Sequence, residues 1–269
     1  MDQAVAEAEV ISSEGFTDLL LVSSEDREYI TVDYLTELAG RLRTMFSSIS
    51  IEIHQLEQHE YADLFKAGIE GVTLYQETYD RNVYNTYHLG GPKADYKRRL
   101  RGPDSFAQAQ MRRLGLGVLL GLTDWRLETM ALAEHAHYLI KNYWQSQVSF
   151  SFPRLRPAND VQKQQFKYIL TDTDLVQMIL ALRLCFADAG LVLSTRESAD
   201  LRDALVKLGI TKMSAGSKTN PGGYLEEGDS VEQFTVSDQR SVYEIADMLS
   251  RSGIEPVWKD WDCAFIKIV

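Results

Sequence analysis

Two arginines in the segment SFPRLRP are well suited to binding a carboxylate. Arg154 and Arg156 lie two positions apart on a segment that Pro153 and Pro157 stiffen. Each guanidinium can form paired hydrogen bonds with a carboxylate, so an amino-acid substrate fits this segment. The spacing is equally typical of a basic turn whose arginines pair with neighbouring acids. Both interpretations stay open from these residues alone.

A second polar group stands in LSTRES, where Ser194, Arg196 and Glu197 end an apolar run. A hydroxyl, a guanidinium and a carboxylate together can hold the two charged groups of a zwitterion. Ser198 is also a suitable N-cap residue for a following helix. The two interpretations are compatible with each other.

Lys218, in the run SAGSKTNPGGY, is a candidate Schiff-base nucleophile, but nothing around it indicates the desolvation that such chemistry needs. The run also lacks the glycine and lysine order of a phosphate-binding loop. The glycines of GLGVLLG do not match the dinucleotide fingerprint, and close backbone packing beside a strand explains them. We therefore favour a solvated lysine and expect no nicotinamide site.

The spacing of the cysteines and of the two neighbouring histidines does not indicate a metal site. Cys185 lies in ILALRLCFADAG, which predicts a buried structural thiol, and Cys263 stands alone near the C-terminus. His135 and His137 are two apart on a predicted helix and so point in different directions. We predict packing or surface roles for both histidines.

The composition indicates a globular protein that binds neither nucleic acid nor membrane. The formal net charge is −11, with 28 basic and 39 acidic residues, which argues against a general phosphate or anionic-lipid binder. The opening MDQAVAEAEVISSEGF is not a signal peptide, and no apolar run is long enough to span a bilayer. We expect a cytoplasmic protein with one domain over residues 1–269.

Short apolar runs alternate with amphipathic helical patterns along the chain, which predicts parallel strand–helix–strand units. Gly68, Gly190 and Gly209 stand where helices should end in a left-handed C-cap. A doubly wound sheet also fits, but so many consecutive units favour a TIM-type α/β barrel. The predicted strands are 19–23, 50–56, 71–77, 116–122, 148–153, 191–196 and 211–217, and the clearest predicted helices are 31–46, 59–68, 126–144, 172–190 and 198–209.

The two ends of the sequence add expectations of their own. The chain starts in a helix-like stretch that feeds the first recognisable strand, so we expect a preceding strand in a complete barrel. Residues 241–262 predict a helix, a glycine cap and a final strand-like aromatic segment.

Reactive groups in such barrels lie where strands end, and polar residues are dense at these points. The positions concerned are Ser23, Ser24, Glu25, His54, Gln55, Gln76, Glu77, Thr78, Asp124, Arg126, Arg154, Arg156, Ser194, Arg196, Glu197, Ser214, Ser217 and Lys218.

Several of these segments, in order, resemble the 2-iminoacetate synthases, the radical SAM tyrosine lyases of thiamine biosynthesis. The segments that carry the resemblance are LLLVSSE, GVTLYQETY, GLGVLLGL, YWQSQVSFSFPRLRP, LSTRES, SKTNPGGY and PVWKDWD. The resemblance implies a radical SAM barrel with a C-terminal segment associated with biotin and thiamine synthesis over about 125–269. It implies a 4Fe-4S cluster and S-adenosylmethionine as cofactors, cleavage of tyrosine to p-cresol and 2-iminoacetate, and thiazole synthase as a partner.

The resemblance also assigns roles to particular residues. Glu25 matches the acid of a Gly-Gly-Glu-type strand end that binds the amino group of S-adenosylmethionine, although Ser23 and Ser24 replace the small residues usual there. Glu77 matches the QETY strand end beside the nucleoside, and Arg99 matches an arginine near the methionine carboxylate.

On the substrate side, the resemblance assigns Arg154, Arg156, Ser194 and Arg196 to the carboxylate of tyrosine. No residue is singled out as catalytic. The family's CxxxCxxC cluster loop is not in this sequence, so we expect the chain as given to be truncated or inactive. The alternatives are a non-catalytic binding module that keeps affinity for S-adenosylmethionine, an amino acid or thiazole synthase, and a cluster-independent lyase that uses Lys218.

Overall fold

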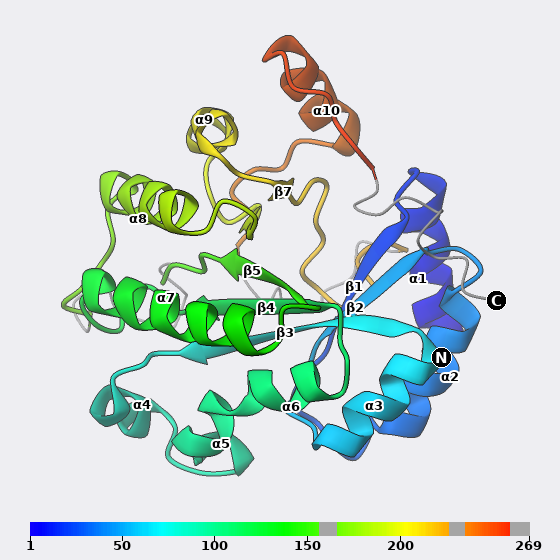
Figure 1. The fold of residues 1–269 in the computed structure, drawn as a ribbon. Coiled ribbons are helices and arrows are strands. Elements are labelled where there is room, and N and C mark those ends of the chain that lie inside the picture. Colours follow the sequence, from blue (N-terminus) through cyan, green and yellow to red (C-terminus); the bar gives the residue numbers. More distant parts are fainter. Residues whose placement is uncertain (156–165, 226–234, 259–269) are drawn as a thin grey trace.

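The parallel sheet of this protein has seven strands whose spatial order follows their order in the sequence. The computed structural model describes residues 1–155, 166–225 and 235–258. Every strand pair is parallel, and the sheet curls so that the helices lie around its outer side (Figure 1). The strands are β1 Asp18–Val22, β2 Ser48–Glu52, β3 Ile69–Glu77, β4 Arg113–Val118, β5 Gln147–Ser151, β6 Gly190–Leu193 and β7 Lys212–Met213. All seven predicted strands are thus confirmed, within an α/β partial barrel.

Helices connect the strands and close the outer layer. They are α1 Asp2–Ser13, α2 Val32–Leu42, α3 Gln58–Ala67, α4 Arg81–Tyr87, α5 Tyr96–Leu100, α6 Gly102–Gln108, α7 Trp125–Asn142, α8 Asp172–Cys185, α9 Ala199–Leu205 and α10 Val242–Arg251, with short 3-10 turns η1 Pro92–Ala94 and η3 Val206–Leu208. None of the helices in the described part of the chain is long and apolar enough to cross a membrane.

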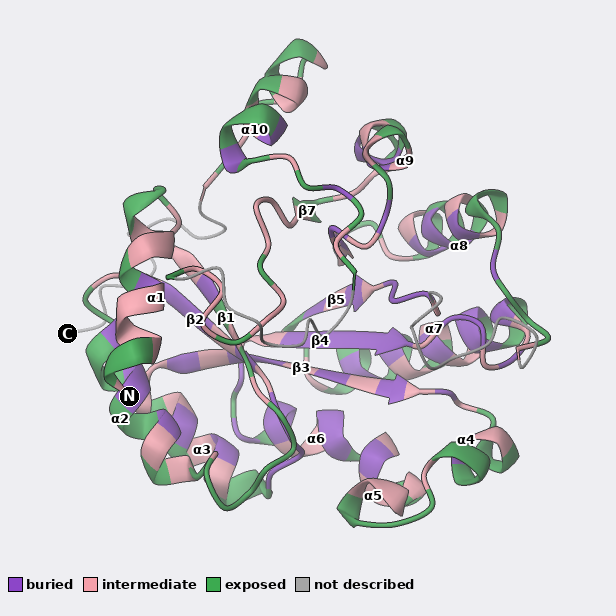
Figure 2. Ribbon diagram, turned by 180° about the vertical axis from the view of Figure 1, so that it is seen from behind, coloured by how far each residue is buried: buried purple, intermediate pink, exposed green. Residues whose placement is uncertain are grey.

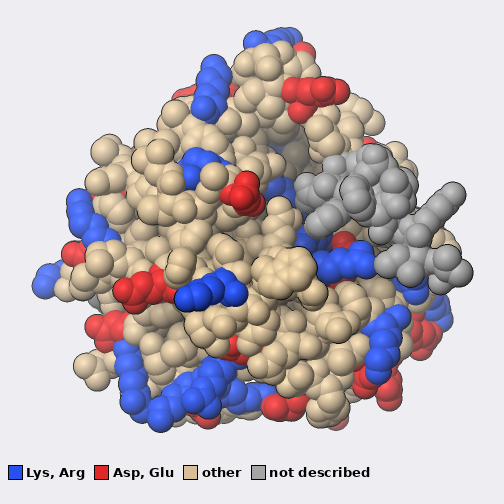
Figure 3. Space-filling model, in the orientation of Figure 1, with Lys and Arg blue, Asp and Glu red and all other residues tan. Residues whose placement is uncertain are grey.

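The two faces of the sheet differ because side chains alternate along each strand. In β3, Leu74 and Gln76 are buried and face α6 and α7, whereas Thr73, Tyr75 and Glu77 are only partly buried and face the concave side. The buried apolar core therefore lies between the sheet and the helices, where the ribbon is coloured as buried in Figure 2. Figure 3 shows basic and acidic side chains interspersed over one outer face.

The glycines of β4 make room on the concave side. A Cβ on Gly115 would lie 2.3 Å from the hydroxyl oxygen of Thr73, and a Cβ on Gly117 would lie 2.7 Å from the ring of Tyr75. These distances are too short for any larger residue, so side chains from β3 pass directly over β4. The close packing predicted for these glycines is confirmed.

Two local predictions were wrong. Gly68 and Gly209 have the left-handed conformation expected of helix C-caps, but Gly190 is the first residue of β6. Cys185 is exposed, because the buried stripe of α8 ends at Leu182, and the partly buried Phe186 that follows the helix packs its ring at 5.4 Å from that of Phe150. The predicted final strand runs into residues 259–269, which lie outside the described residues together with Cys263.

Candidate active site

Four charged side chains form a cluster beyond the carboxyl ends of β1 and β3, which we call the β3-side cluster: Glu25, Glu77, Lys93 and Arg99. The ammonium of Lys93 lies 2.9 Å from the Glu77 carboxylate and 3.5 Å from that of Glu25. Arg99 approaches Glu77 to 3.7 Å and donates a hydrogen bond from Nε to the carbonyl of Tyr75 at 2.7 Å. The structure therefore brings Glu25, Glu77 and Arg99 together, and it adds Lys93.

The backbone at the end of β3 aims Glu77 at this cluster. The pairing of β3 with β4 shifts register between Tyr75 and Glu77, and Glu77 has a φ of 68°, in the left-handed region. Such a conformation in a residue other than glycine costs free energy and is most common at functional sites. Thr78 and the backbone of Tyr79 both donate hydrogen bonds to Glu128, which fixes the turn that follows.

Arg154, from the loop after β5, is buried and pairs with the buried Glu197 and with the exposed Asp172. Its Nε donates to Glu197 at 2.9 Å, its Nη1 lies 2.8 Å from Asp172, and Nη2 also pairs with Glu197. Burial by itself lowers the pKa of this guanidinium, but the hydrogen bonds with Glu197 outweigh it and raise the pKa. An anion that used Arg154 would have to compete with two carboxylates already bound to it.

Ser194 and Arg196 follow β6 and are both half-buried. The hydroxyl oxygen of Ser194 accepts a hydrogen bond from the backbone of Arg196 at 3.3 Å, which orders the segment. Ser198 is the N-cap residue of α9 by position, without a side-chain cap hydrogen bond. Arg156 lies outside the described residues.

A further polar group lies inside the barrel, and none of the sequence patterns indicated it. Glu52 ends β2 and is partly buried, and the Tyr75 hydroxyl of β3 is close enough to influence the pKa of its carboxyl group. Burial raises the pKa of Glu52, while Tyr75 opposes that shift, and burial likewise raises the pKa of Tyr75. Arg196, Glu77 and Arg99 are close enough to influence Glu52.

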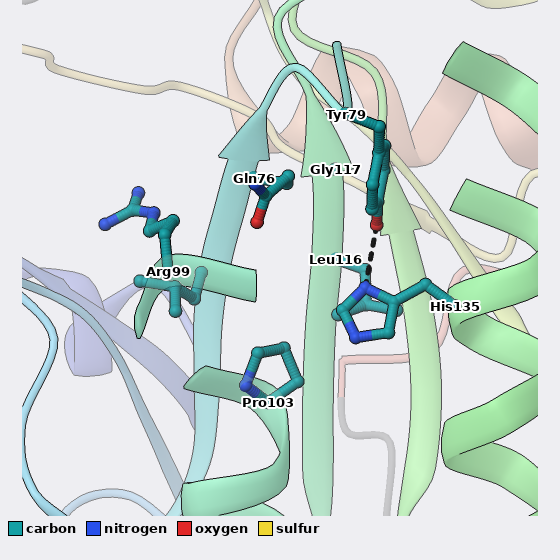
Figure 4. A pocket seen from close by; sticks show the side chains of 8 residues that line it. Gln76, Tyr79, Arg99, Pro103, Leu116, Gly117 and His135 are labelled. Atoms are coloured by element: carbon teal, nitrogen blue, oxygen red, sulfur yellow. Dashed lines mark hydrogen bonds between the residues drawn. The ribbon is translucent and has the colours of Figure 1, made fainter. Parts of the chain in front are cut away.

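The helix side of β3 and β4 carries a separate polar pair. The hydroxyl of Tyr79 lies 2.8 Å from Nδ1 of His135, near Gln76 and Pro103 (Figure 4). Burial lowers the pKa of His135, which favours a neutral ring packed against Tyr79. His137 is exposed, so the two histidines point in different directions as predicted, and His135 has a packing role.

The described residues provide no set of ligands for a metal cluster. They contain no group of three histidine, cysteine or acidic side chains that could hold a metal ion. Cys185, the one cysteine among them, is exposed at the end of α8. Lys218 is exposed as well, which gives a Schiff-base mechanism no desolvated amine.

Comparison with solved structures defines the class of this protein. The fold superimposes on a crystal structure of HydG, a maturase of the [FeFe]-hydrogenase, with a TM-score of 0.91 and 33% identity over 96% of this chain and 58% of that chain. Methylornithine synthase (PylB) shares the fold with a TM-score of 0.73 at 17% identity, over 97% of this chain and 74% of its own. The fold is therefore the partial barrel of the radical SAM type.

Sequence comparison narrows this class to a family. The 2-iminoacetate synthases of Salmonella typhimurium and Escherichia coli are each 42% identical to this chain over 257 residues, which is 95% of this chain and 68% of theirs. The Biotin and Thiamin Synthesis associated domain matches residues 151–255. The chain belongs to the 2-iminoacetate synthase family. It spans 58% of the HydG chain and about two thirds of the two synthases.

Proposed function

We propose that this chain binds S-adenosylmethionine and tyrosine at the mouth of its barrel, as the ligand-binding part of a lyase. The lyase converts tyrosine to 2-iminoacetate and p-cresol and supplies the thiazole of thiamine. The observation that carries the proposal is the meeting of Glu25, Glu77 and Arg99 around Lys93, because three separated segments converge there. Membership in the 2-iminoacetate synthase family supports the choice of ligands.

The β3-side cluster suits S-adenosylmethionine by the chemistry of its groups. That ligand presents an ammonium, a carboxylate and ribose hydroxyls. Glu25 and Glu77 offer carboxylate acceptors to the ammonium and hydroxyls, and Arg99 offers a guanidinium to the carboxylate. Half of the Glu25 side chain is solvent-accessible, so a ligand can reach it. Lys93 lies between the two acids and would exchange its contacts with them for contacts with the ligand.

Tyrosine is assigned to the opposite side of the mouth, after β5 and β6. Arg196 is the guanidinium we propose for its carboxylate, with the neighbouring Ser194 hydroxyl as a second polar group. Arg154 supports this side through its pairs with Glu197 and Asp172, which anchor the start of α8 and the segment before α9. Arg156 stays a prediction for the same role.

The radical chemistry that the family implies needs a 4Fe-4S cluster, and the described residues supply no ligands for one. Lyase activity therefore requires cluster thiolates from beyond these residues. A chain that binds both ligands without such thiolates is the second candidate, a non-catalytic binding module. Docking on thiazole synthase is compatible with either candidate and belongs to the proposal.

Calorimetric titration of the purified chain tests the proposal directly. S-adenosylmethionine and L-tyrosine should each bind, and saturation with one should leave a site for the other. Anaerobic reconstitution with iron and sulfide should give no charge-transfer band at about 400 nm. A stoichiometric cluster would contradict the assignment, and failure to bind either ligand would contradict the function.

Fusion to a family segment that carries CxxxCxxC separates the two candidates. Formation of p-cresol by the fused protein would establish the lyase. Binding of both ligands with an intact cluster but without p-cresol would favour the binding module.

A further inference from the structure

Lys93 is the cation that joins the two acids of the β3-side cluster. Its ammonium lies 2.9 Å from the carboxylate of Glu77 and 3.5 Å from that of Glu25, whereas Arg99 stays 3.7 Å from Glu77. The Nε of Arg99 donates instead to the carbonyl of Tyr75 at 2.7 Å. In the described part of the chain, Lys93 is the only lysine that forms an ion pair with either acid. It therefore supplies the positive charge that the two carboxylates share.

The backbone of Lys93 is held in place, so its ammonium can move without the turn that carries it. Lys93 lies in η1, which follows Gly91 with its φ of 71° and begins at Pro92 with its restricted φ. The hydroxyl of Tyr84 donates a hydrogen bond to the carbonyl of Lys93 at 2.5 Å. Tyr84 is buried, and its ring packs at 5.2 Å from that of Tyr96. Because a lysine ammonium sits on a flexible stem, it can leave the acids while this turn stays in place.

The ammonium of Lys93 occupies the place that the ammonium of a ligand would take. Both are primary ammonium groups with the same charge and the same N–H donors, so carboxylates bind either in the same way. Glu77 keeps its position, because it ends β3 and its side chain is only 16% exposed. A ligand that carries an ammonium must therefore displace Lys93 before it can contact both acids.

A displaced Lys93 needs a new anion, and an amino-acid ligand carries one beside its ammonium. The α-ammonium and the α-carboxylate of such a ligand sit on the same carbon atom, so the carboxylate arrives close to the lysine that has just left the acids. Arg99 would otherwise have to neutralise this carboxylate alone, although its Nε is already bonded to Tyr75. A ligand that lacks the carboxylate breaks the ion pairs of Lys93 and offers it no anion in return.

We propose that Lys93 selects ligands that carry an α-carboxylate beside an α-ammonium. It occupies the ammonium site in the free protein and moves to the carboxylate when such a ligand binds. This inference rests on the proposed function, because S-adenosylmethionine is the ligand assigned to the cluster. It adds specificity to that site, since Lys93 opposes the binding of an ammonium ligand that has no carboxylate.

Calorimetric titration of the full chain with three nucleosides tests this inference. These are S-adenosylmethionine, decarboxylated S-adenosylmethionine, which keeps the amine but lacks the carboxylate, and 5′-methylthioadenosine, which lacks both groups. The variant Lys93→Met keeps a flexible side chain and removes the charge. It should bind the decarboxylated ligand about 3- to 10-fold more tightly than the wild type does, because the competing ammonium is gone.

The same variant should bind S-adenosylmethionine about 3- to 10-fold more weakly, because the carboxylate of the ligand loses a charge-assisted contact. The affinity for 5′-methylthioadenosine should stay as in the wild type, since that ligand has neither group. Opposite changes for two ligands that differ only in a carboxylate are the result that a structural role of Lys93 would not give.

Two further variants serve as controls. Lys93→Arg keeps the positive charge, so it should retain most of the preference for S-adenosylmethionine over the decarboxylated ligand. Lys97→Met removes an exposed lysine of the neighbouring α5 and should change none of the three affinities. Urea denaturation of each variant shows whether stability changes as well.

The outcomes distinguish this inference from the proposed function. Weaker or unchanged binding of the decarboxylated ligand by Lys93→Met would overturn the inference. Equal weakening of all three ligands, with a lower urea midpoint, would give Lys93 a structural role and also overturn it. If the wild type binds S-adenosylmethionine and Lys93→Met keeps the same preference, the inference fails and the proposed function stands. Failure of the wild type to bind any of the three ligands would contradict both.

Discussion

Charged residues gather at both ends of the parallel sheet, but the two ends use them differently. At the amino ends of the strands, Arg113 of β4 lies 2.7 Å from Asp18 of β1 and 3.3 Å from Glu70 of β3, and Lys212 of β7 also lies 2.7 Å from Asp18. We call this group the strand-start network. At the carboxyl ends, Glu25 and Lys93 are partly exposed and open to a ligand.

The difference follows from what each end must do. The strand-start network links the first and last strands, which do not pair by backbone hydrogen bonds in the described sheet. In barrels of this kind, charges at the amino ends serve stability and those at the carboxyl ends serve the reaction. Arg154 departs from that rule, since it lies at the carboxyl end and is buried in pairs with Glu197 and Asp172.

Arg154→Ala should give the largest effect and tests that exception. The variant removes the guanidinium that pairs with Glu197, which is 2% exposed, and breaking a buried pair costs about 3–5 kcal/mol of unfolding free energy. Urea denaturation followed by circular dichroism measures this cost. A stable Arg154→Ala protein that has lost tyrosine binding would instead move Arg154 to the ligand side.

Arg113→Ala should destabilise somewhat less. Asp18 keeps Lys212, and Glu70 keeps Arg112 at 3.3 Å and the Ser48 hydroxyl at 2.7 Å. The loss should therefore be about 3 kcal/mol, near the lower end for a buried pair. Ligand affinities, measured by calorimetry on the folded fraction, should stay within twofold of wild type. A large loss of tyrosine affinity would break the distinction between the two ends.

Arg196→Ala should show the opposite pattern. Loss of a charge-assisted contact with a carboxylate should weaken tyrosine by about 1.5–3 kcal/mol, while S-adenosylmethionine binding stays close to wild type. Titrations with both ligands on one preparation provide the comparison. Equal weakening of the two ligands would remove Arg196 from the substrate side.

These differences show which parts of the fold and of the candidate site can be predicted from the sequence alone. The strands are predictable because each is a short apolar or β-branched run between helical patterns. Helices α4 and α6 have only seven residues and α5 only five, which is too short for a clear apolar period. The sequence could not separate Arg154 from Arg196, because the carboxylate that holds Arg154 belongs to Glu197, the neighbour of Arg196 in the chain.

The sequence also could not predict which residues of different strands become neighbours when the sheet forms. Glu52 stood in a predicted strand without any motif, and Tyr75 and Ser151, which pair in register on either side of β4, come from two other strands. The glycine between them, Gly117, was predicted to allow close packing, but its effect on Tyr75 depends on strand register. Lys93 lies in the short 3-10 turn η1 after α4, and no pattern in the sequence pointed to it.

Lys212→Met should have the smallest effect on the free energy of unfolding. The pH dependence of that effect tests whether the strand-start network serves stability. Lys212 is 44% exposed, so its pair with Asp18 contributes only about 0.5–1 kcal/mol at neutral pH. Burial by itself would raise the pKa of Asp18, but Lys212 and Arg113 together hold it below its usual value of 3.8. The stability from this acid is therefore fully present above pH 3.8 and is lost as pH falls through the lower folded-state pKa.

Without Lys212, the pKa of Asp18 moves back toward its usual value, and the acid loses part of its preference for the folded state. The variant should therefore be less stable than wild type at neutral pH and approach it in strong acid, where both proteins carry a protonated Asp18. Urea midpoints measured from pH 7 down to pH 2 follow this convergence. Arg251→Ala, which breaks an exposed pair within α10, should change stability by only about 0.3–0.5 kcal/mol and without convergence. Parallel curves for wild type and Lys212→Met would show that Asp18 is held by Arg113 alone, and that the link between β1 and β7 adds no stability through Lys212.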